Sequence, residues 1–113
     1  MSVFLEIAQG IYDTLGPGYS EAVYHNAFEV ALRDRGISYE TERILPVKYL
    51  GKVIGNLRID LLVDGHTIIE LKAVRRLTDE AICQVQRYKE QLGVTTTGHV
   101  FNFGPSELQF REV

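Results

Sequence analysis

One cysteine and no long apolar run are the most informative shortages in this chain of 113 residues. Cys83 cannot form an internal disulfide and has no second thiol with which to build a zinc site, so neither a disulfide-stapled secreted fold nor a zinc finger explains the sequence. We expect Cys83 to be a small buried or half-buried filler. No stretch approaches the ~18 to 20 apolar residues that cross a bilayer, and no basic-then-apolar leader is recognisable. The expectation is a cytoplasmic protein without a membrane partner.

The chain also lacks repeats, low-complexity segments and linkers, and its length allows one hydrophobic core. We therefore expect a single domain over residues 1–113. Apolar residues make up 45% of the sequence, with five Phe and six Tyr, which is typical of a globular protein. The net charge of −3 argues against non-specific coating of nucleic acid. It leaves room for a local basic surface around Arg75, Arg76, Arg87 and Lys89, although scattered charge is usually a solvated surface.

Helical spacing of apolar residues predicts two helices at the start of the chain. Residues 2–14 place apolar side chains three and four positions apart, and "GPG" at 16–18 ends that helix. A second helix is predicted from Ser20, a suitable N-cap, to Arg35, with Gly36 ending it. Its inward stripe consists of Tyr24, Ala27, Phe28, Ala31 and Leu32.

From Tyr39 the apolar pattern changes to a period of two, which predicts strands. Pro46 cannot donate a hydrogen bond to a neighbouring strand, so the first strand should lie at an edge or be bulged there. Three strands are expected at 39–50, 53–63 and 66–74, with turns at "GK" (51–52) and "DG" (64–65), then a helix over 78–92 and strands over 96–103 and 107–113. This order predicts an α/β (α+β) fold, a central mixed sheet of four to five strands flanked by helices.

Three charged residues interrupt the apolar pattern of the second and third strands: Asp60, Glu70 and Lys72. Residues two apart on a strand share a face, so Glu70 and Lys72 point the same way, about 6.6 Å apart along the backbone. Leu71, between them, points to the opposite face. Whether Asp60 joins Glu70 and Lys72 depends on how many residues connect the two strands.

A two-residue turn at 64–65 would send the Asp60 carboxylate to the other face. A three-residue connection, for example 63–65 with Gly65 in the left-handed conformation, places Asp60 opposite Ile68 and Arg58 opposite Glu70. All three charged side chains then share a face. We predict an odd-numbered connection.

Two carboxylates on neighbouring strands repel each other unless a positive charge lies between them. Mg²⁺ prefers one or two carboxylates with waters and substrate phosphate oxygens, which Asp60, Glu70 and an adjacent backbone carbonyl can accommodate. Lys72 would then lie beside the metal-bound water or the scissile phosphate. This arrangement favours phosphodiester hydrolysis. The alternative is an exposed sheet face with an ordinary cross-strand pair of Glu and Lys.

Two other segments contribute candidate residues. Glu21 lies three positions before Tyr24 on the stripe that otherwise packs inward, where an acid needs a partner, although it could instead complement the dipole of the helix start. Gln84 and Tyr88 lie four positions apart on one face of the third helix. The alternative for this second pair is a polar flank to a core-facing stripe.

These segments together resemble the PD-(D/E)XK nuclease superfamily, and within it the small GxxExxY family. The motif that names the family is complete as "GYSEAVY", from Gly18 to Tyr24. The signature Asp…(Asp/Glu)-x-Lys matches Asp60, Glu70 and Lys72, and Gln84 with Tyr88 resembles the QxxxY element of some members. The likeness runs from about residue 10 to residue 103. One departure is that Ile59, and not proline, precedes the aspartate.

The resemblance implies a restriction-endonuclease-like core that uses one or two Mg²⁺ or Mn²⁺ ions to cut nucleic acid. Asp60 and Glu70 would be direct metal ligands, with the Leu71 carbonyl beside them, and Lys72 would be the catalytic lysine. Glu21 would reach the metal through water. Gln84 and Tyr88 would steady the site or contact the substrate backbone.

The substrate we expect is nucleic acid, DNA in preference to RNA. A homodimer is expected if the enzyme makes paired cuts, because one small chain carries one site. The alternative is a catalytically inactive module that binds nucleic acid or protein on the same fold. The histidines, His25, His66 and His99, have no spacing that makes a zinc site, and we expect none of them to act as a ligand or base. Tyr24 is expected in the core or beside the site, not as a nucleophile.

Overall fold

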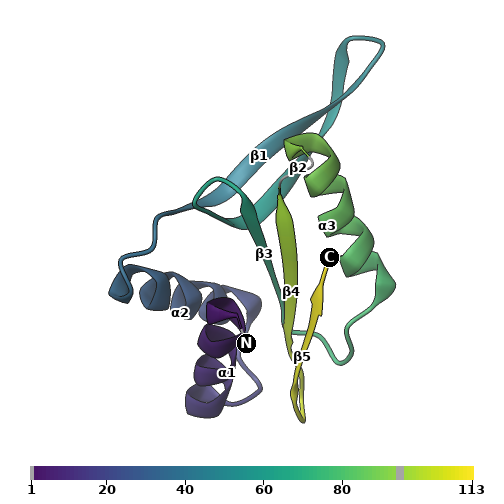
Figure 1. The fold of residues 1–113 in the computed structure, drawn as a ribbon. Coiled ribbons are helices and arrows are strands. Elements are labelled where there is room, and N and C mark those ends of the chain that lie inside the picture. Colours follow the sequence, from purple (N-terminus) through teal and green to yellow (C-terminus); the bar gives the residue numbers. More distant parts are fainter. Residues whose placement is uncertain (1, 94–95) are drawn as a thin grey trace.

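The computed structural model describes residues 2–93 and 96–113, and the element order is as predicted (Figure 1). The elements are α1 (Val3–Leu15), α2 (Glu21–Asp34), β1 (Tyr39–Tyr49), β2 (Lys52–Val63), β3 (Thr67–Lys72), α3 (Asp79–Leu92), β4 (Thr97–Phe103) and β5 (Leu108–Glu112). Among the described helices, none combines the length and the apolar character needed to span a bilayer.

The five strands form one mixed sheet in the order β1-β2-β3-β4-β5. β3 and β4 are parallel, and the other neighbours are antiparallel. A parallel pair needs a long crossover, which α3 supplies between β3 and β4. β1 is an edge strand, so the expectation drawn from Pro46 is confirmed. Its register with β2 shifts between Val47 and Lys48, where Ile54 of β2 is left without a partner residue.

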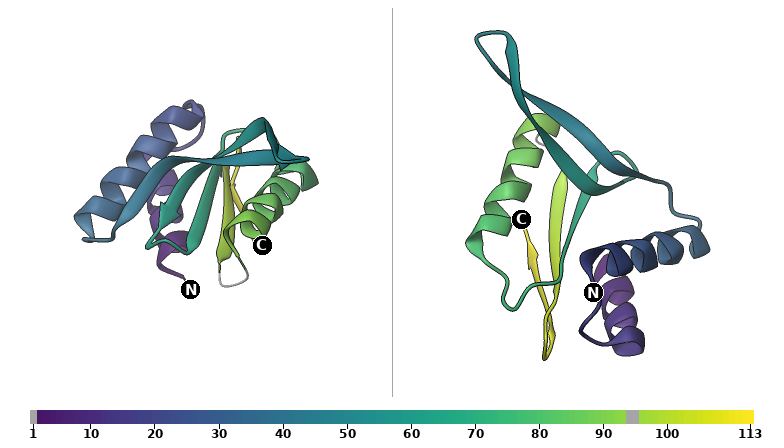
Figure 2. Two further views of the ribbon diagram at one scale, coloured as in Figure 1. Left: turned by 90° about the horizontal axis from the view of Figure 1, so that it is seen from above. Right: turned by 180° about the vertical axis from the view of Figure 1, so that it is seen from behind.

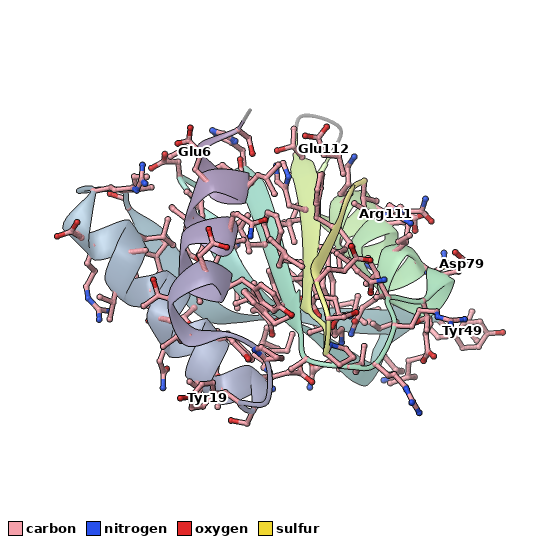
Figure 3. All side chains as sticks on the ribbon, turned by 90° about the horizontal axis from the view of Figure 1, so that it is seen from below. Glu6, Tyr19, Tyr49, Asp79, Arg111 and Glu112 are labelled. Carbon is pink, nitrogen blue, oxygen red and sulfur yellow. The ribbon has the colours of Figure 1, made fainter. Side chains whose placement is uncertain are left out.

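Helices cover both faces of the sheet, and each face has its own hydrophobic core (Figure 2). α1 and α2 pack on one face against residues that include Leu61, Ile69, Leu71, Phe101 and Phe103. α3 packs on the other face against residues that include Leu45, Ile59, Leu62, Ile68 and Val100. Side chains fill both interfaces between helices and sheet (Figure 3).

The predicted inward stripe of α2 is confirmed, since Tyr24, Phe28 and Leu32 are fully buried. The prediction for Cys83 is wrong, because this residue is exposed. α3 turns Ala81, Val85 and Tyr88 towards the sheet, and Cys83 lies on the outer side of the same helix.

The hairpin of β1 and β2 projects well beyond the rest of the molecule (Figures 1 and 2). Tyr49 pairs with Lys52, so its turn consists of Leu50 and Gly51, one residue earlier than predicted. Both turn residues have positive φ, 48° and 76°, as the common two-residue hairpin turn requires. The observed turn differs from the predicted one because Lys52 is the first residue of β2.

Candidate active site

The connection between β2 and β3 has three residues, 64–66, because Val63 pairs with Thr67. The predicted odd number and the left-handed Gly65, with φ of 76°, are both confirmed. The predicted register is two positions off. Continuing the pairing of Leu61 with Ile69 aligns Asp60 with Glu70, since β2 runs to Val63 and the turn lies one residue later than predicted.

Asp60 lies where β2 separates from β3. Pairing with β3 ends at Leu61, and pairing with β1 omits Asp60 and Glu42, whose φ is 56°. The backbone N–H of Leu71 donates to Asp60 Oδ2 at 2.9 Å. Ile59 packs in the core under α3, whereas Leu61 packs under α1 and α2, so the strand's alternation is broken at Asp60. The carboxylate is therefore directed towards the backbone of β3.

Glu70 is buried next to Asp60, with 3% of its surface exposed. Its Oε2 lies 3.6 Å from Lys72 Nζ, and its Oε1 has no hydrogen-bond partner within the described part of the chain. Burial raises the pKa of Glu70 to about 8, with a further rise from the Asp60 carboxylate and a partial offset from Lys72. A cation at Oε1 would stabilise the charged carboxylate that burial disfavours.

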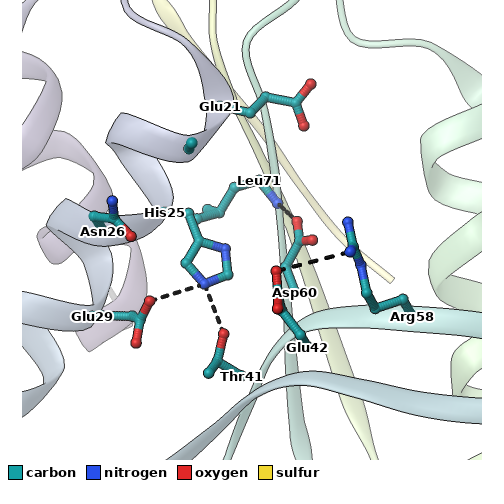
Figure 4. Close-up of a pocket in the computed structure, with 10 residues that line it drawn as sticks. Glu21, His25, Asn26, Glu29, Thr41, Glu42, Arg58, Asp60 and Leu71 are labelled. Atoms are coloured by element: carbon teal, nitrogen blue, oxygen red, sulfur yellow. Dashed lines mark hydrogen bonds and ion pairs between the residues drawn. The ribbon is translucent and has the colours of Figure 1, made fainter.

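Glu21 and Asp60 line one pocket of about 390 Å³, here called the Asp60 pocket (Figure 4). The prediction that Glu21 lies on the inward stripe is wrong, because Glu21 is exposed. α2 begins at Glu21, and the buried stripe starts one turn later, at Tyr24. The pocket lies between α2 and the strands and is lined by Glu21, Ala22, His25, Asn26, Glu29, Thr41, Glu42, Arg58, Asp60 and Leu71.

Lys72 and Gln84 line a different pocket of about 630 Å³ beside α3. Glu70 and Lys72 share a face, as predicted, and Leu71 packs in the opposite core. Asp60 does not stand on the face of Lys72, because its side chain lines the Asp60 pocket on the α2 side. The buried Glu70 carboxylate interacts electrostatically with Asp60, which lines one pocket, and with Lys72, which lines the other.

Tyr88 is fully buried, so it cannot contact the backbone of a substrate, and that half of the expectation for Tyr88 is wrong. Its hydroxyl donates to the Arg58 carbonyl at 2.8 Å, two residues before Asp60. Burial, followed by the charges of Glu70 and Asp60, raises the pKa of Tyr88, so the hydroxyl remains a donor. Tyr88 therefore holds β2 in place just before the Asp60 carboxylate.

Tyr24 anchors the turn before α2 and does not line the Asp60 pocket. Its hydroxyl donates to the Gly16 carbonyl at 2.6 Å and accepts from the Tyr19 N–H at 3.3 Å. Its ring stacks on Phe103 with centroids 4.2 Å apart. Gly18, in the same turn, has φ of 104°, which favours glycine. Tyr24 thus fixes where α2 begins and where Glu21 lies.

The sequence reasoning missed His25 as a residue of the pocket. Its Nε2 lies 2.9 Å from Thr41 Oγ1 and 3.2 Å from Glu29 Oε2 (Figure 4). The available signal was the spacing of Glu21, His25 and Glu29, four residues apart each time and therefore on one helix face. Thr41 was not predictable in this way, because it comes from β1.

Within residues 2–93 and 96–113, no three His, Cys, Asp or Glu side chains are grouped closely enough to hold a metal ion. Mg²⁺ does not require such a group, since one or two carboxylates suffice when waters and phosphate oxygens complete the shell. Asp60, the unpartnered oxygen of Glu70 and a nearby backbone carbonyl are hard oxygen donors. This donor set fits a hard divalent cation.

Comparison with known proteins agrees with this geometry. A family model described as the PD-(D/E)XK nuclease superfamily matches residues 1–113. The chain belongs to the PD-(D/E)XK nuclease superfamily. The three helices and five-stranded mixed sheet of residues 2–93 and 96–113 form the restriction-endonuclease-like fold of that superfamily, whose members are generally nucleases and typically use Mg²⁺.

A solved structure also matches, the crystal structure of a protein designated SSO0001, with a TM-score of 0.65 and 21% sequence identity. The match covers 81% of this chain and 48% of that chain, so the chain spans about half the length of that protein. At this identity the likeness supports the fold alone. No curated protein matches the sequence significantly.

Proposed function

We propose that the chain is a metal-dependent nuclease that hydrolyses phosphodiester bonds in nucleic acid, DNA in preference to RNA. One observation carries the proposal. The buried Glu70 carboxylate has an oxygen without a hydrogen-bond partner among the described residues, beside the carboxylate of Asp60. Two adjacent carboxylates with one lysine leave net negative charge in a desolvated place, which favours binding of a cation.

Asp60 and Glu70 are the proposed direct ligands of Mg²⁺ or Mn²⁺, with the Leu71 carbonyl beside them. Glu21, exposed at the rim of the same pocket as Asp60, would reach the ion through water. When bound, such an ion activates water and offsets charge on the phosphate. The N–H of Leu71 holds the Asp60 carboxylate in a fixed orientation before any ion arrives.

Lys72 neutralises part of the charge on Glu70 and would orient the attacking water or offset charge that develops on the phosphate. Gln84 lines the pocket that Lys72 also lines, so it would contact the substrate or steady the lysine. Tyr88 is the positioning residue, because its hydroxyl binds the backbone of β2 two residues before Asp60.

We also propose that the chain is a member of the GxxExxY family. Each residue that names the motif has a role in building the Asp60 pocket. Gly18 adopts a positive φ in the turn before α2, Glu21 begins the helix and lines the pocket, and Tyr24 binds the turn through its hydroxyl. These roles give a structural reason for the spacing of Gly18, Glu21 and Tyr24 in the motif.

As a further part of the proposal, residues 1–113 form one nuclease-like domain, and two copies associate when a duplex is cut on both strands. One chain carries one Asp60 pocket of this composition, and paired cuts need two sites related by symmetry. Sedimentation of the protein with and without duplex DNA checks the association.

Cleavage assays test the central proposal. Mg²⁺ or Mn²⁺ should support cleavage of DNA, and Asp60→Asn, Glu70→Gln and Lys72→Met should each reduce the rate by about 100-fold or more, because each removes a group expected at the metal or the phosphate. Glu90→Gln is the matched control, since Glu90 is an exposed acid in the last turn of α3 that pairs with Arg87. Equal rates for the wild type and the site variants on single-stranded, duplex and branched DNA would contradict the proposal.

An inactive binding module on the same fold is the second candidate. The observation that favours it is the net charge of −3, which leaves few basic residues to hold a long nucleic-acid substrate. Calorimetric titration with Mn²⁺ separates the two. Binding that Asp60→Asn abolishes supports the nuclease, whereas no binding even with an oligonucleotide present supports the module.

A further inference from the structure

The pocket of about 630 Å³ beside α3, here called the Lys72 pocket, differs in charge from the Asp60 pocket. Four acids and one arginine line the Asp60 pocket, so its lining carries −3 with His25 neutral: Glu21, Glu29, Glu42, Asp60 and Arg58. Three cations and one acid line the Lys72 pocket, so its lining carries +2: Lys72, Arg76, Arg87 and Glu80. Carboxylates suit a divalent cation, whereas grouped cations suit the phosphates of nucleic acid. The Lys72 pocket therefore has the charge of an anion site and not of a metal site.

α3 forms one wall of the Lys72 pocket. Glu80, Gln84 and Arg87 are spaced by four and three residues, so they follow one face of the helix. Gln84, between the other two along the helix, is half-buried. Arg87 pairs with Glu90 at 3.3 Å, but both side chains are exposed, and exposed pairs of this kind contribute little to stability. Glu90 therefore does not prevent Arg87 from binding a phosphate.

The segment between β3 and α3 forms another wall, and two amide side chains hold it in place. The backbone N–H of Val74 donates to Asn102 Oδ1 at 2.8 Å, and Asn102 Nδ2 donates to the Val74 carbonyl at 3.0 Å. The N–H of Leu77 donates to Gln109 Oε1 at 2.8 Å, and this oxygen also accepts from Asn102 Nδ2 at 3.0 Å. The backbone is therefore fixed on both sides of Arg76, which lies between the two bound residues.

Arg76 is available to an anion. Its side chain is exposed and forms no salt bridge within residues 2–93 and 96–113. Asn102 is fully buried, and its side-chain hydrogen bonds hold a segment whose charged residues are Arg75 and Arg76. A charged group binds a ligand more tightly when it is held in position before the ligand arrives. The amide pair of Asn102 and Gln109 supplies this order at Arg76.

We propose that the Lys72 pocket binds a phosphate group of the nucleic-acid strand, next to the phosphodiester held at the Asp60 pocket. Arg76 and Arg87 bind its oxygens through their guanidinium groups, and Gln84 donates a hydrogen bond from its amide. The inference rests on the proposed nuclease function and deepens it, because it assigns the side of the sheet on which the substrate strand continues. It also explains how a net acidic chain holds a polyanion, because cations gather in one pocket beside the site.

The end of β3 gives the strand a path between the two pockets. Leu71 lines the Asp60 pocket, and Lys72, the next residue, lines the Lys72 pocket. The pairing of β2 with β3 ends at Leu61, so the neighbouring strand does not cover the last residues of β3 on that side. A strand that crosses this edge contacts both pockets, and the Lys72 pocket supplies the positive charge that the Asp60 pocket lacks.

A second copy of the chain, bound through an acidic surface, is the competing occupant. The position of Lys72 favours nucleic acid. A protein surface seated in the Lys72 pocket would cover this lysine, which lies 3.6 Å from the Glu70 carboxylate and would act on the phosphate in the proposed reaction.

Cys83 supplies a direct probe, because it is the single cysteine of the chain, is exposed and lines the Lys72 pocket. A strand bound in the pocket covers the thiol and should slow its alkylation by iodoacetamide, which mass spectrometry measures. The experiment uses the Asp60→Asn protein and short single-stranded DNA with a chelator, so that neither metal binding nor cutting contributes. DNA at about ten times its Kd should slow alkylation about tenfold.

Two substitutions in the lining should have opposite effects on the binding of fluorescently labelled DNA, which anisotropy measures. Arg76→Gln should weaken binding about tenfold, reduce the slope of log K against log salt by about 0.7, and remove the protection of Cys83 at the same DNA concentration. Glu80→Gln removes an acid from the lining and should strengthen binding. Arg35→Gln is the matched control, because Arg35 is an exposed arginine at the end of α2, which covers the other face of the sheet.

The outcomes separate this inference from the proposed function. Equal Kd values for Arg76→Gln and Arg35→Gln, or alkylation that DNA does not slow, overturn the phosphate site even if the wild type cuts DNA. Weaker binding by Arg76→Gln together with stronger binding by Glu80→Gln supports it, even if no cleavage is found. If Arg76→Gln changes the sedimentation coefficient and leaves DNA binding intact, the pocket is an interface between copies and the inference fails.

A comparison of 5′-phosphorylated and 5′-hydroxyl strands of one sequence identifies the phosphate. Equal protection of Cys83 by both strands supports an internal phosphodiester in the Lys72 pocket. Protection by the phosphorylated strand alone supports a terminal phosphate there.

Discussion

Glu70 is the residue on which the candidate site depends most. It is buried, it lies beside a second carboxylate, and the Lys72 ammonium is 3.6 Å away. A charged carboxylate buried in this way destabilises the folded protein unless a cation or a proton binds it. Buried acids with a strongly raised pKa are common at functional sites. Tyr88 stabilises the position of Asp60, because its hydroxyl donates a hydrogen bond to the Arg58 carbonyl in the same strand.

The first prediction concerns pH. Below about pH 4.5, Glu70 is protonated in the folded and the unfolded chain, so it does not affect the free energy of unfolding. Above that value the unfolded chain ionises, whereas the folded chain keeps its proton until the pKa of Glu70, about 8, is reached. The free energy of unfolding should therefore fall as the pH rises from about 4.5 to about 8 and level off above it.

Urea unfolding in the presence of a chelator measures this dependence. Glu70→Gln, which has no proton to lose, should be less sensitive to pH over the same range. Glu90→Gln, an exposed control, should follow the wild type. A wild-type curve parallel to that of Glu70→Gln would show that Glu70 is charged in the folded protein.

At the scale of elements, α3 approaches the sheet closely at Gly98. A Cβ placed on Gly98 would lie 2.5 Å from the Val85 side chain, which is fully buried and branched and so has little freedom to move. Gly98 therefore allows α3 to lie close to β4. The same helix carries Tyr88 three residues later, so this close approach also sets how far the Tyr88 hydroxyl reaches towards β2.

Gly98→Ala should destabilise the protein by about 1 to 3 kcal/mol, because the methyl group overpacks the interface. Gly10→Ala is the matched control. Gly10 lies inside α1 with no described atom within 4 Å of an added Cβ, so the change should stabilise the protein by about 0.5 to 1 kcal/mol. Urea unfolding measures the change in the free energy of unfolding of both variants. No change in Gly98→Ala would contradict the prediction and would mean that α3 can shift outwards.

At the scale of the whole molecule, the candidate site lies at the junction where the projecting hairpin of β1 and β2 meets the rest of the sheet (Figure 1). Glu42 and Asp60 interrupt the ladder of β1 and β2 at this junction, and Arg58 pairs with Glu42 at 3.9 Å. The junction also joins α2 to the sheet through His25 and Thr41. Binding at the site should therefore stabilise the whole fold and not one element.

Mn²⁺ should raise the melting temperature. An ion at about 100 times its Kd adds about 2.7 kcal/mol to the free energy of unfolding, which corresponds to roughly 10 °C or more for a domain of this size. Asp60→Asn should abolish most of this rise, although its amide oxygen can still accept the Leu71 N–H. Glu90→Gln should keep it. Differential scanning fluorimetry measures the shift, and an equal rise in the Asp60→Asn variant would place the ion elsewhere.

The sequence alone determined the order of the elements, the odd number of residues between the second and third strands, the face shared by Glu70 and Lys72, and the buried stripe of α2. These follow from local rules, because side-chain periodicity and turn chemistry act between residues close along the chain. Sequence spacing therefore identified the family resemblance before any contact was known.

Only the tertiary structure decided which side of the sheet each candidate faces. Asp60 turns towards the Leu71 N–H because β2 leaves β3 there, Glu21 is exposed because α2 starts at the rim of the pocket, and Tyr88 points into the core. The association of His25 with Thr41 likewise joins residues from a helix and a strand. Such contacts depend on how the elements pack, and the pattern within one element carries no information about its distant neighbours.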